Sequence, residues 1–298
     1  PNPNPNPNPN PNPNPKSGAN PDTKPAANPP TPARPLAPFV WRTQGPKPSY
    51  FIGTIHVGQS LADAPKAVHN ALRQCNALVL EADIAHPDRT AAAKLMQTTP
   101  SPLVRKALGR QRWRRLLQLT GLTTEQAKSL RPWALHMSVA IRQLPKGAGL
   151  DEGLLAFANT QKLRLGYLET TVAALQILAD FPDEKLLAEL AETVDHPEQV
   201  ATEARRLLAA FRAGDADELA RLTFDSESAR RFPQLNRRFI GDRNRAWMPK
   251  IRSLLAAGSV CIAVGAGHLV GPDSLQKLLK AHGVQTARVP EALIPNFP

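Results

Sequence analysis

Residues 49–56 read Ser-Tyr-Phe-Ile-Gly-Thr-Ile-His, and residues 259–268 read Ser-Val-Cys-Ile-Ala-Val-Gly-Ala-Gly-His. Each stretch is a run of β-branched and aromatic residues, typical of a strand, followed by Gly-x-x-His that ends at His56 or at His268. Side chains just past the carboxyl ends of parallel strands face the crevice where ligands bind. Independent packing gives no reason for this pattern to occur twice, so the pair predicts a functional site.

The segments around these two stretches predict an α/β fold. Residues 39–43 and 49–55 indicate a hairpin at the edge of a sheet, because its turn is rich in proline. A helix over 63–75 and a strand over 76–80 follow, and this order predicts a βαβ unit whose two strands are parallel neighbours. Further strands are predicted at 163–168, 259–264 and 284–289, the last two joined by a helix over 273–282 as a second βαβ unit. We therefore expect a central mixed, mostly parallel sheet flanked by helices, with a large helical insertion between the two βαβ halves.

Helical patterns fill most of the chain between these halves, from 87 to 143 and again up to 255. Thr123, followed three residues later by glutamine, is typical of a helix start, and Pro132 predicts a break or a new helix. A shorter helix is predicted at 151–161.

The first residues of the 298-residue chain have a different composition. Residues 1–15 alternate proline and asparagine, and we expect residues 1–38 to be a disordered tether, because such a segment has too little apolar surface to offset chain entropy. Residues 39–298 suit a single domain. A start at proline would follow from removal of a signal peptide, or equally from a shortened sequence, and the former gives the expectation of a periplasmic or secreted protein.

The chain has a net charge of +12, and residues 104–115 carry six cations and no acid. A basic helix can contact nucleic acid or an anionic membrane. We favour a solvated helix face with Trp113, Leu116 and Leu117 packed inward, since charge alone specifies no partner, and we do not expect nucleic-acid binding. No run of about 18 apolar residues is present, so no transmembrane segment is expected.

The two cysteines, Cys75 and Cys261, form no metal-binding or redox motif. Buried free thiols are favoured over a disulfide, although spacing alone leaves both open.

Four residues with reactive side chains lie at or just past the ends of predicted strands: His56, Glu81, Glu169 and His268. If the strands are parallel neighbours, these side chains converge at one rim. Two imidazoles with carboxylates suit Zn²⁺, Mn²⁺ or Co²⁺ with a water in an open position. They equally suit a metal-free hydrolase with a histidine as general base. Asp83 shares a strand face with Glu81 and could support it.

Other polar residues have simpler interpretations. Glu81 closes an apolar strand, so it lies either at a site or in a salt bridge. Asp151 is most simply a helix N-cap. Arg243 and Asn244 are most simply surface residues of a helix.

Several ordered segments nevertheless resemble the TraB/GumN family, which includes the TIKI Wnt-inactivating proteases, and they cover about residues 39–290. The similar segments are Tyr50-Phe-Ile-Gly-Thr-Ile-His-Val-Gly58, Ala77-Leu-Val-Leu-Glu-Ala-Asp83, Arg131-Pro-Trp-Ala134, Gly149-Leu-Asp151, Gly166-Tyr-Leu-Glu-Thr170 with Gln176, Asp242-Arg-Asn-Arg245, and Val264-Gly-Ala-Gly-His-Leu269 with Gly271.

The resemblance implies an α/β fold related to the erythromycin esterase and ChaN-like group. It also implies that Asp151, Glu169, Arg243 and Asn244 lie at the site or support residues that do. TIKI proteins resemble metal-dependent peptidases, which favours a divalent metal at His56 and His268. Fold-level likeness is a weak guide to chemistry.

The resulting hypothesis is a metal-dependent hydrolase acting on peptides or proteins. His56, His268 and Glu169 would hold the metal, Glu81 would be the general base, and Arg243 would stabilise developing negative charge, with Asp151 and Asn244 in support. The alternatives are a non-catalytic haem-, iron- or peptide-binding protein, and a metal-free esterase-like hydrolase.

Overall fold

The computed structural model describes residues 37–291. The predicted tether, residues 1–38, lies outside the described residues except for its last two positions. Within 37–291, no helix combines the length and the apolar character that crossing a membrane requires.

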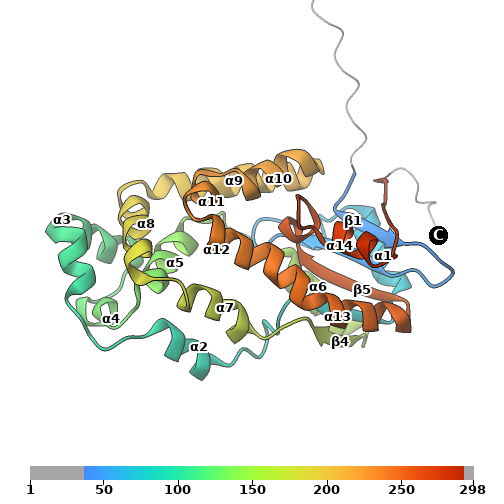
Figure 1. Ribbon diagram of the computed structural model, residues 1–298, viewed down its shortest axis with the longest axis horizontal. Coiled ribbons are helices and arrows are strands. Elements are labelled where there is room, and N and C mark those ends of the chain that lie inside the picture. Colours follow the sequence, from blue (N-terminus) through green and yellow to red (C-terminus); the bar gives the residue numbers. More distant parts are fainter. Residues whose placement is uncertain (1–36, 292–298) are drawn as a thin grey trace, which may run out of the picture. The chain divides into compact units, whose positions relative to one another are not determined.

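A six-stranded mixed sheet forms the centre of the α/β fold (Figure 1). Its spatial order is β4-β3-β5-β2-β1-β6. The strands β2 to β5 are parallel, whereas β1 is antiparallel to both β2 and β6. The strand bounds are β1 Val40–Thr43, β2 Tyr50–Thr54, β3 Ala77–Leu80, β4 Arg164–Tyr167, β5 Val260–Gly265 and β6 Thr286–Arg288.

Strand positions agree with the prediction, but strand neighbours do not. β2 and β3 are parallel, yet β5 lies between them, with Ile52 opposite Ala263 and Val79 opposite Ile262. The predicted hairpin is present, but β6 covers β1 and is itself the edge strand. Likewise β5 and β6 are separated by β2 and β1 rather than adjacent. The apolar patterns identify strands but not their partners, which pair across about 200 residues.

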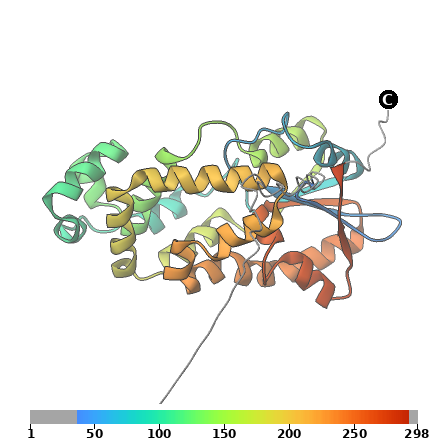
Figure 2. The ribbon, with the colours of Figure 1, turned by 90° about the horizontal axis from the view of Figure 1, so that it is seen from above.

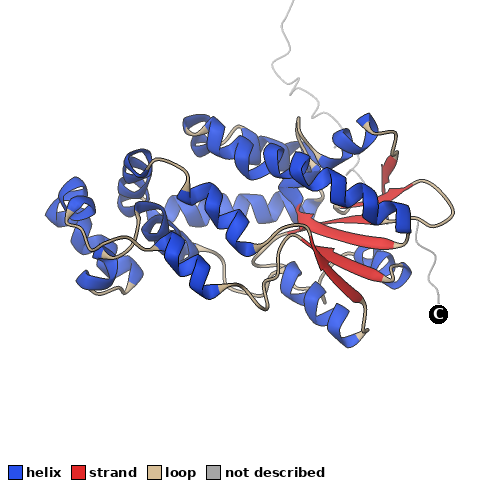
Figure 3. Ribbon diagram, turned by 60° about the horizontal axis from the view of Figure 1, so that its bottom comes forward, coloured by secondary structure: helices blue, strands red, loops and turns tan. Residues whose placement is uncertain are grey.

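The faces of the sheet follow from right-handed crossovers, the rule for parallel strands. The steps β2 to β3 and β3 to β4 run one way along the sheet, whereas β4 to β5 and β5 to β6 run the other way. Helices α1 and α6 therefore cover one face, and α13 and α14 cover the other. Figure 3 shows the strands with helices packed around them. The main core lies between these layers, with Phe51, Ile52, Leu78 and Ile262 fully buried.

Between β3 and β5 the chain is helical except for β4, as predicted (Figure 2). Thr123 forms the expected capping box, and Pro132 is the first residue of α5. The helix bounds are α1 Lys66–Gln74, α2 Arg89–Met96, α3 Leu103–Thr120, α4 Thr124–Lys128, α5 Pro132–Gln143, α6 Leu150–Thr160, α7 Thr171–Ala179, α8 Asp183–Asp195, α9 Pro197–Ala213, α10 Ala216–Phe224, α11 Glu227–Arg231, α12 Pro233–Arg237, η1 Arg238–Asp242, α13 Arg243–Ala257, η2 Ala266–Leu269 and α14 Leu275–Ala281.

The basic segment 104–115 belongs to α3 and packs as expected. Trp113 and Leu116 are buried in a second core shared with α5 and α8, and Leu117 is partly buried against it. The helix bends at Gly109, whose φ of 73° is in the left-handed region that glycine tolerates.

The preference for free thiols is wrong, because Cys75 and Cys261 form a disulfide. Cys75 ends α1, Cys261 lies on β5, and their Cα atoms are 5.6 Å apart. β5 lies beside β2, and α1, which follows β2, packs over β5. This packing brings together two cysteines that are 186 residues apart in the sequence. The bond ties the strand that leads to His268 to the first helix.

Candidate functional site

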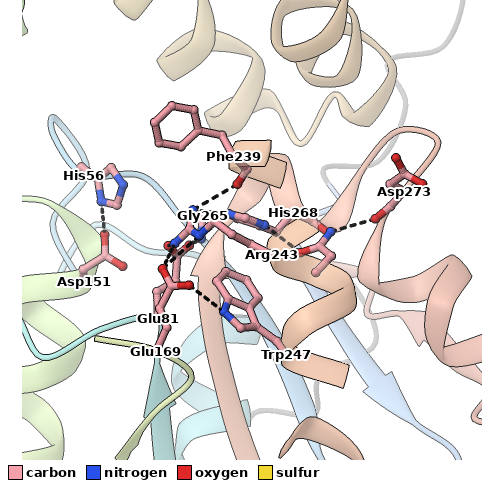
Figure 4. A network of polar contacts seen from close by, with 11 residues as sticks. His56, Glu81, Asp151, Glu169, Phe239, Arg243, Trp247, Gly265, His268 and Asp273 are labelled. Carbon is pink, nitrogen blue, oxygen red and sulfur yellow. Dashed lines mark hydrogen bonds and ion pairs between the residues drawn. The ribbon is translucent and has the colours of Figure 1, made fainter. Parts of the chain in front are cut away.

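The site lies at the carboxyl ends of β3, β4 and β5 (Figure 4). β3 and β5 are neighbours, but the connections that follow them leave toward opposite faces of the sheet. Such a switch point opens a crevice beyond the strand ends, where ligands bind in open α/β sheets. Glu81 follows β3, Glu169 follows β4, and His268 follows β5.

A guanidinium, that of Arg243 at the start of α13, occupies the centre of the site. Its Nη2 donates to Glu81 Oε2 at 2.6 Å and to Glu169 Oε1 at 2.7 Å, and its Nε donates to Glu169 Oε1 at 2.9 Å. The three side chains are 12 to 17% exposed. One cation thus holds together two largely buried carboxylates that would otherwise repel each other.

Two further groups from the same helical segment fix this arrangement. Arg243 Nη1 donates to the carbonyl of Phe239, which lies in a short π-helical turn, a distortion frequent at functional sites. Trp247 lies one turn after Arg243 and therefore on the same face of α13. Its Nε1 donates to Glu169 Oε2 at 3.0 Å, and its ring lies against the guanidinium, 4.7 Å away.

The proton position on His268 follows from Asn244. The Asn244 amide nitrogen donates to the carbonyls of His268 and Asp273, so its Oδ1 is an acceptor, 2.7 Å from His268 Nδ1. Nδ1 therefore carries the hydrogen, and Nε2 accepts from Arg243 Nη1 at 3.2 Å. Asn244 is fully buried and the side chain of Arg243 is only 12% exposed, so the interpretation of these two residues as surface residues is wrong. A helical pattern does not show that a partner covers its polar side.

The charges of the buried pair are set by burial and by Arg243. Burial lowers the pKa of His268 to about 4, so the ring is neutral at pH 7. Burial would raise the pKa of Glu81, but His268 when protonated, Arg243, and the Gly265 N–H at 2.6 Å together lower it to about 2. Because His268 is neutral at pH 7, Arg243 is the permanent charge that keeps Glu81 ionised.

His56 is the exposed member of the site. Its side chain is 75% exposed, and Nδ1 lies 2.9 Å from Asp151 Oδ2. The hydrogen bond to Asp151 raises the pKa of His56 to about 9. His56 and Asp151 lie beside the buried cluster (Figure 4), and the charges of Glu81 and Arg243 also act on the pKa of His56. The free Nε2 is the ring atom available to a ligand.

Gly149 makes the His56–Asp151 contact possible. A Cβ at position 149 would lie 2.1 Å from the carbonyl oxygen of His56, so only glycine fits. The next residue, Leu150, donates its N–H to the carbonyl of Ile55. This contact brings the first turn of α6 to the end of β2. The N-cap of α6 is Gly149, so the interpretation of Asp151 as the cap is wrong.

The structure thus joins Glu81, Glu169, Arg243, Asn244 and His268 in one network, with His56 and Asp151 beside it. Asp83 is outside: its carboxylate accepts from the backbone of Ala85 and His86. The predictions missed Trp247, whose spacing of four from Arg243 was the available signal. They also missed the Gly265 N–H and the Phe239 carbonyl, because backbone groups leave no mark in a sequence.

The donor set does not fit a divalent cation held by His56, His268 and Glu169. His268 Nε2 faces a guanidinium, both Glu169 oxygens accept hydrogen bonds, and His56 is bonded to Asp151 instead. Within residues 37–291, no three His, Cys, Asp or Glu side chains are grouped as metal ligands. Metal binding therefore stays a prediction. In the structure, the cation that the carboxylates of Glu81 and Glu169 bind is the guanidinium of Arg243.

Fold and site together define an α/β protein with a charged cluster at the switch point of its sheet. The sequence model of the TraB/PrgY/gumN family matches residues 39–288, so the chain belongs to that family. No curated protein and no solved structure matches the sequence.

Proposed function

We propose that the protein is a hydrolase that cleaves peptide bonds, or alternatively carboxylic esters. In this proposal His56, oriented by Asp151, transfers the proton between the attacking water and the leaving group. The observation that carries this proposal is the exposed imidazole whose Nδ1–H is held by a carboxylate at 2.9 Å. Such a pairing orients the ring and leaves Nε2 to exchange a proton with water or with a leaving group.

In this proposal neutral His56 takes a proton from the attacking water as the water oxygen bonds to the carbonyl carbon. The imidazolium then returns that proton to the leaving nitrogen or oxygen as the bond to carbon breaks. Asp151 stabilises the imidazolium that forms in between.

The buried cluster has a supporting role. Both Glu81 oxygens already accept hydrogen bonds, and its pKa of about 2 makes it a weak base. We therefore assign proton transfer to His56 instead of Glu81. The cluster of Glu81, Glu169, Arg243 and His268 supplies charges in fixed positions next to the reacting group. Within it, Arg243 is the cation that would stabilise the negative charge developing on the carbonyl oxygen.

The disulfide supports a location outside the reducing cytosol, since such bonds persist in oxidising compartments. We propose a periplasmic or secreted enzyme, with its peptide substrates in the same compartment.

The test is hydrolysis of a panel of blocked peptides and carboxylic esters, with and without chelator. His56→Asn and Asp151→Asn should each lower kcat/KM by about 10²–10⁴. His86→Asn is the matched control, because His86 is also exposed and lies 3.4 Å from an aspartate, Asp83, outside the site. Activity should survive chelation and rise with pH toward about 9, since only neutral His56 can accept a proton.

Full activity of His56→Asn would refute the assignment. Loss of activity on chelation, with recovery on adding Zn²⁺, Mn²⁺ or Co²⁺, would favour the metal-dependent alternative instead.

A further inference from the structure

Helix α3 presents cations that nothing in the described part of the chain neutralises. Arg105, Lys106, Arg110 and Arg114 are exposed, and none forms an ion pair with a described residue. Arg112 and Arg115 differ: Arg112 pairs with Asp195 of α8 at 2.7 Å, and the charge of Arg115 acts on the same carboxylate. The four free cations form what we call the α3 basic surface.

Without a partner, the clustered positive charges of α3 destabilise the helix. Arg110 and Arg114 are four residues apart, so their like charges are neighbours on one helix face and repel each other. An external anionic partner would turn that repulsion into attraction. No acidic residue lies within α3 to do so.

An apolar side chain accompanies these charges. Leu103, the first residue of α3, is 67% exposed, the largest value among the exposed large apolar residues of the described chain. Exposed cations are attracted to the anionic headgroups of a bilayer, and an exposed leucine can bury apolar surface in its interface. α3 lies at the end of the helical region most distant from the strands, so docking there leaves the site at the sheet open (Figures 1 and 2).

Two observations favour a membrane over nucleic acid. The aromatic residue of this helix, Trp113, is 4% exposed and packed in the core, so it offers no platform for base stacking. The disulfide between Cys75 and Cys261 indicates an oxidising compartment such as the periplasm or the cell surface, which a membrane borders.

We propose that the α3 basic surface docks the protein on a membrane through the headgroups of acidic phospholipids, with Leu103 entering the interface. This inference is independent of the proposed hydrolysis.

The experiment is sedimentation of the full chain with vesicles of phosphatidylcholine alone or mixed with phosphatidylglycerol. Binding should need the acidic lipid and weaken with salt, which screens exposed charges. A fourfold variant, Arg105→Gln, Lys106→Gln, Arg110→Gln and Arg114→Gln, should bind several-hundredfold more weakly, at about fivefold per cation. The matched control removes the same charge from exposed positions on α13 and α14: Lys250→Gln, Arg252→Gln, Lys277→Gln and Lys280→Gln.

The fourfold control variant on α13 and α14 should keep most of the vesicle binding. Leu103→Ser should weaken vesicle binding relative to the wild type. Both fourfold variants should unfold at the temperature of the wild type, because the replaced side chains have no described ion-pair partners. The proposal is overturned if the α3 variant binds as the wild type does, or if the control loses as much. It is also overturned if the protein ignores acidic vesicles but binds random-sequence DNA through the same four residues.

Discussion

Replacing Arg243 by methionine should destabilise the protein strongly at neutral pH and much less in acid. The substitution keeps an apolar stem but leaves Glu81 and Glu169 without their shared cation. Removing one partner from a buried ion pair costs about 3–5 kcal/mol. The lowered pKa of Glu81, about 2, has the same direction, because Arg243 is one of the charges that favour the ionised carboxylate.

The pH dependence follows from the direction of that shift. In the wild type, the pKa of Glu81 is lower folded than unfolded, so its contribution is present above pH 4.5 and is lost as the pH falls toward 2. Without Arg243, the pKa of Glu81 rises, because burial is then opposed only by His268, the Gly265 N–H and His56. The variant is then penalised at pH 7, and protonation relieves it near pH 4. The difference between the two proteins should therefore shrink as the pH falls.

Urea unfolding at pH 7 and pH 4 measures this difference. Arg252→Met is the control, because Arg252 is an exposed arginine on the same helix, and it should change stability by less than about 0.5 kcal/mol. Arg243→Lys should fall between the two, since it restores the charge without the fork of donors. An equal loss at both pH values, or a loss below about 1 kcal/mol at pH 7, would refute the reasoning.

Two other predictions concern the exposed histidine and the disulfide. Asp151→Asn should move the pKa of His56 from about 9 back toward 6.5, as followed by NMR of the ring protons; a wild-type ring that already titrates near 6.5 would contradict the contact. Reduction, or replacement of Cys75 and Cys261 by alanine, should cost about 2–5 kcal/mol in urea unfolding, because the bond closes a long loop. A wild-type midpoint that reductant leaves in place would contradict that expectation, and the alanine variant should not respond to reductant at all.

The strands of this fold could be read from the sequence, but their order could not. Apolar runs such as Val260–Gly265 mark a buried strand wherever it lies in the sheet. Its insertion between β2 and β3 depends on contacts between residues about 200 positions apart, which periodicity does not encode. The disulfide was missed for the same reason, since Cys75 and Cys261 meet only because of that insertion.

Half of the site could be predicted in the same way. Glu81, Glu169 and His268 follow strands, and the meeting of parallel strand ends predicts their convergence. Arg243 and Asn244 lie on a helix whose pattern gives no sign that their side chains are covered, and only the family resemblance pointed to them. The pairing of His56 with Asp151 depends on a close backbone approach at Gly149, which no spacing rule reveals.

The central position of β5 also determines when the site can exist. β5 is the fifth strand to leave the ribosome, and it must enter between two strands made about 200 residues earlier. Until then β2 and β3 have no common neighbour, and Glu81 lacks the N–H of Gly265 and the nearby ring of His268. Pairings of such sequence separation form slowly, because a long loop must close first. A nascent chain that stops before residue 260 would therefore carry His56, Asp151 and Arg243 but lack β5 and His268. It would have no assembled site, which delays any activity until synthesis of the domain is nearly complete.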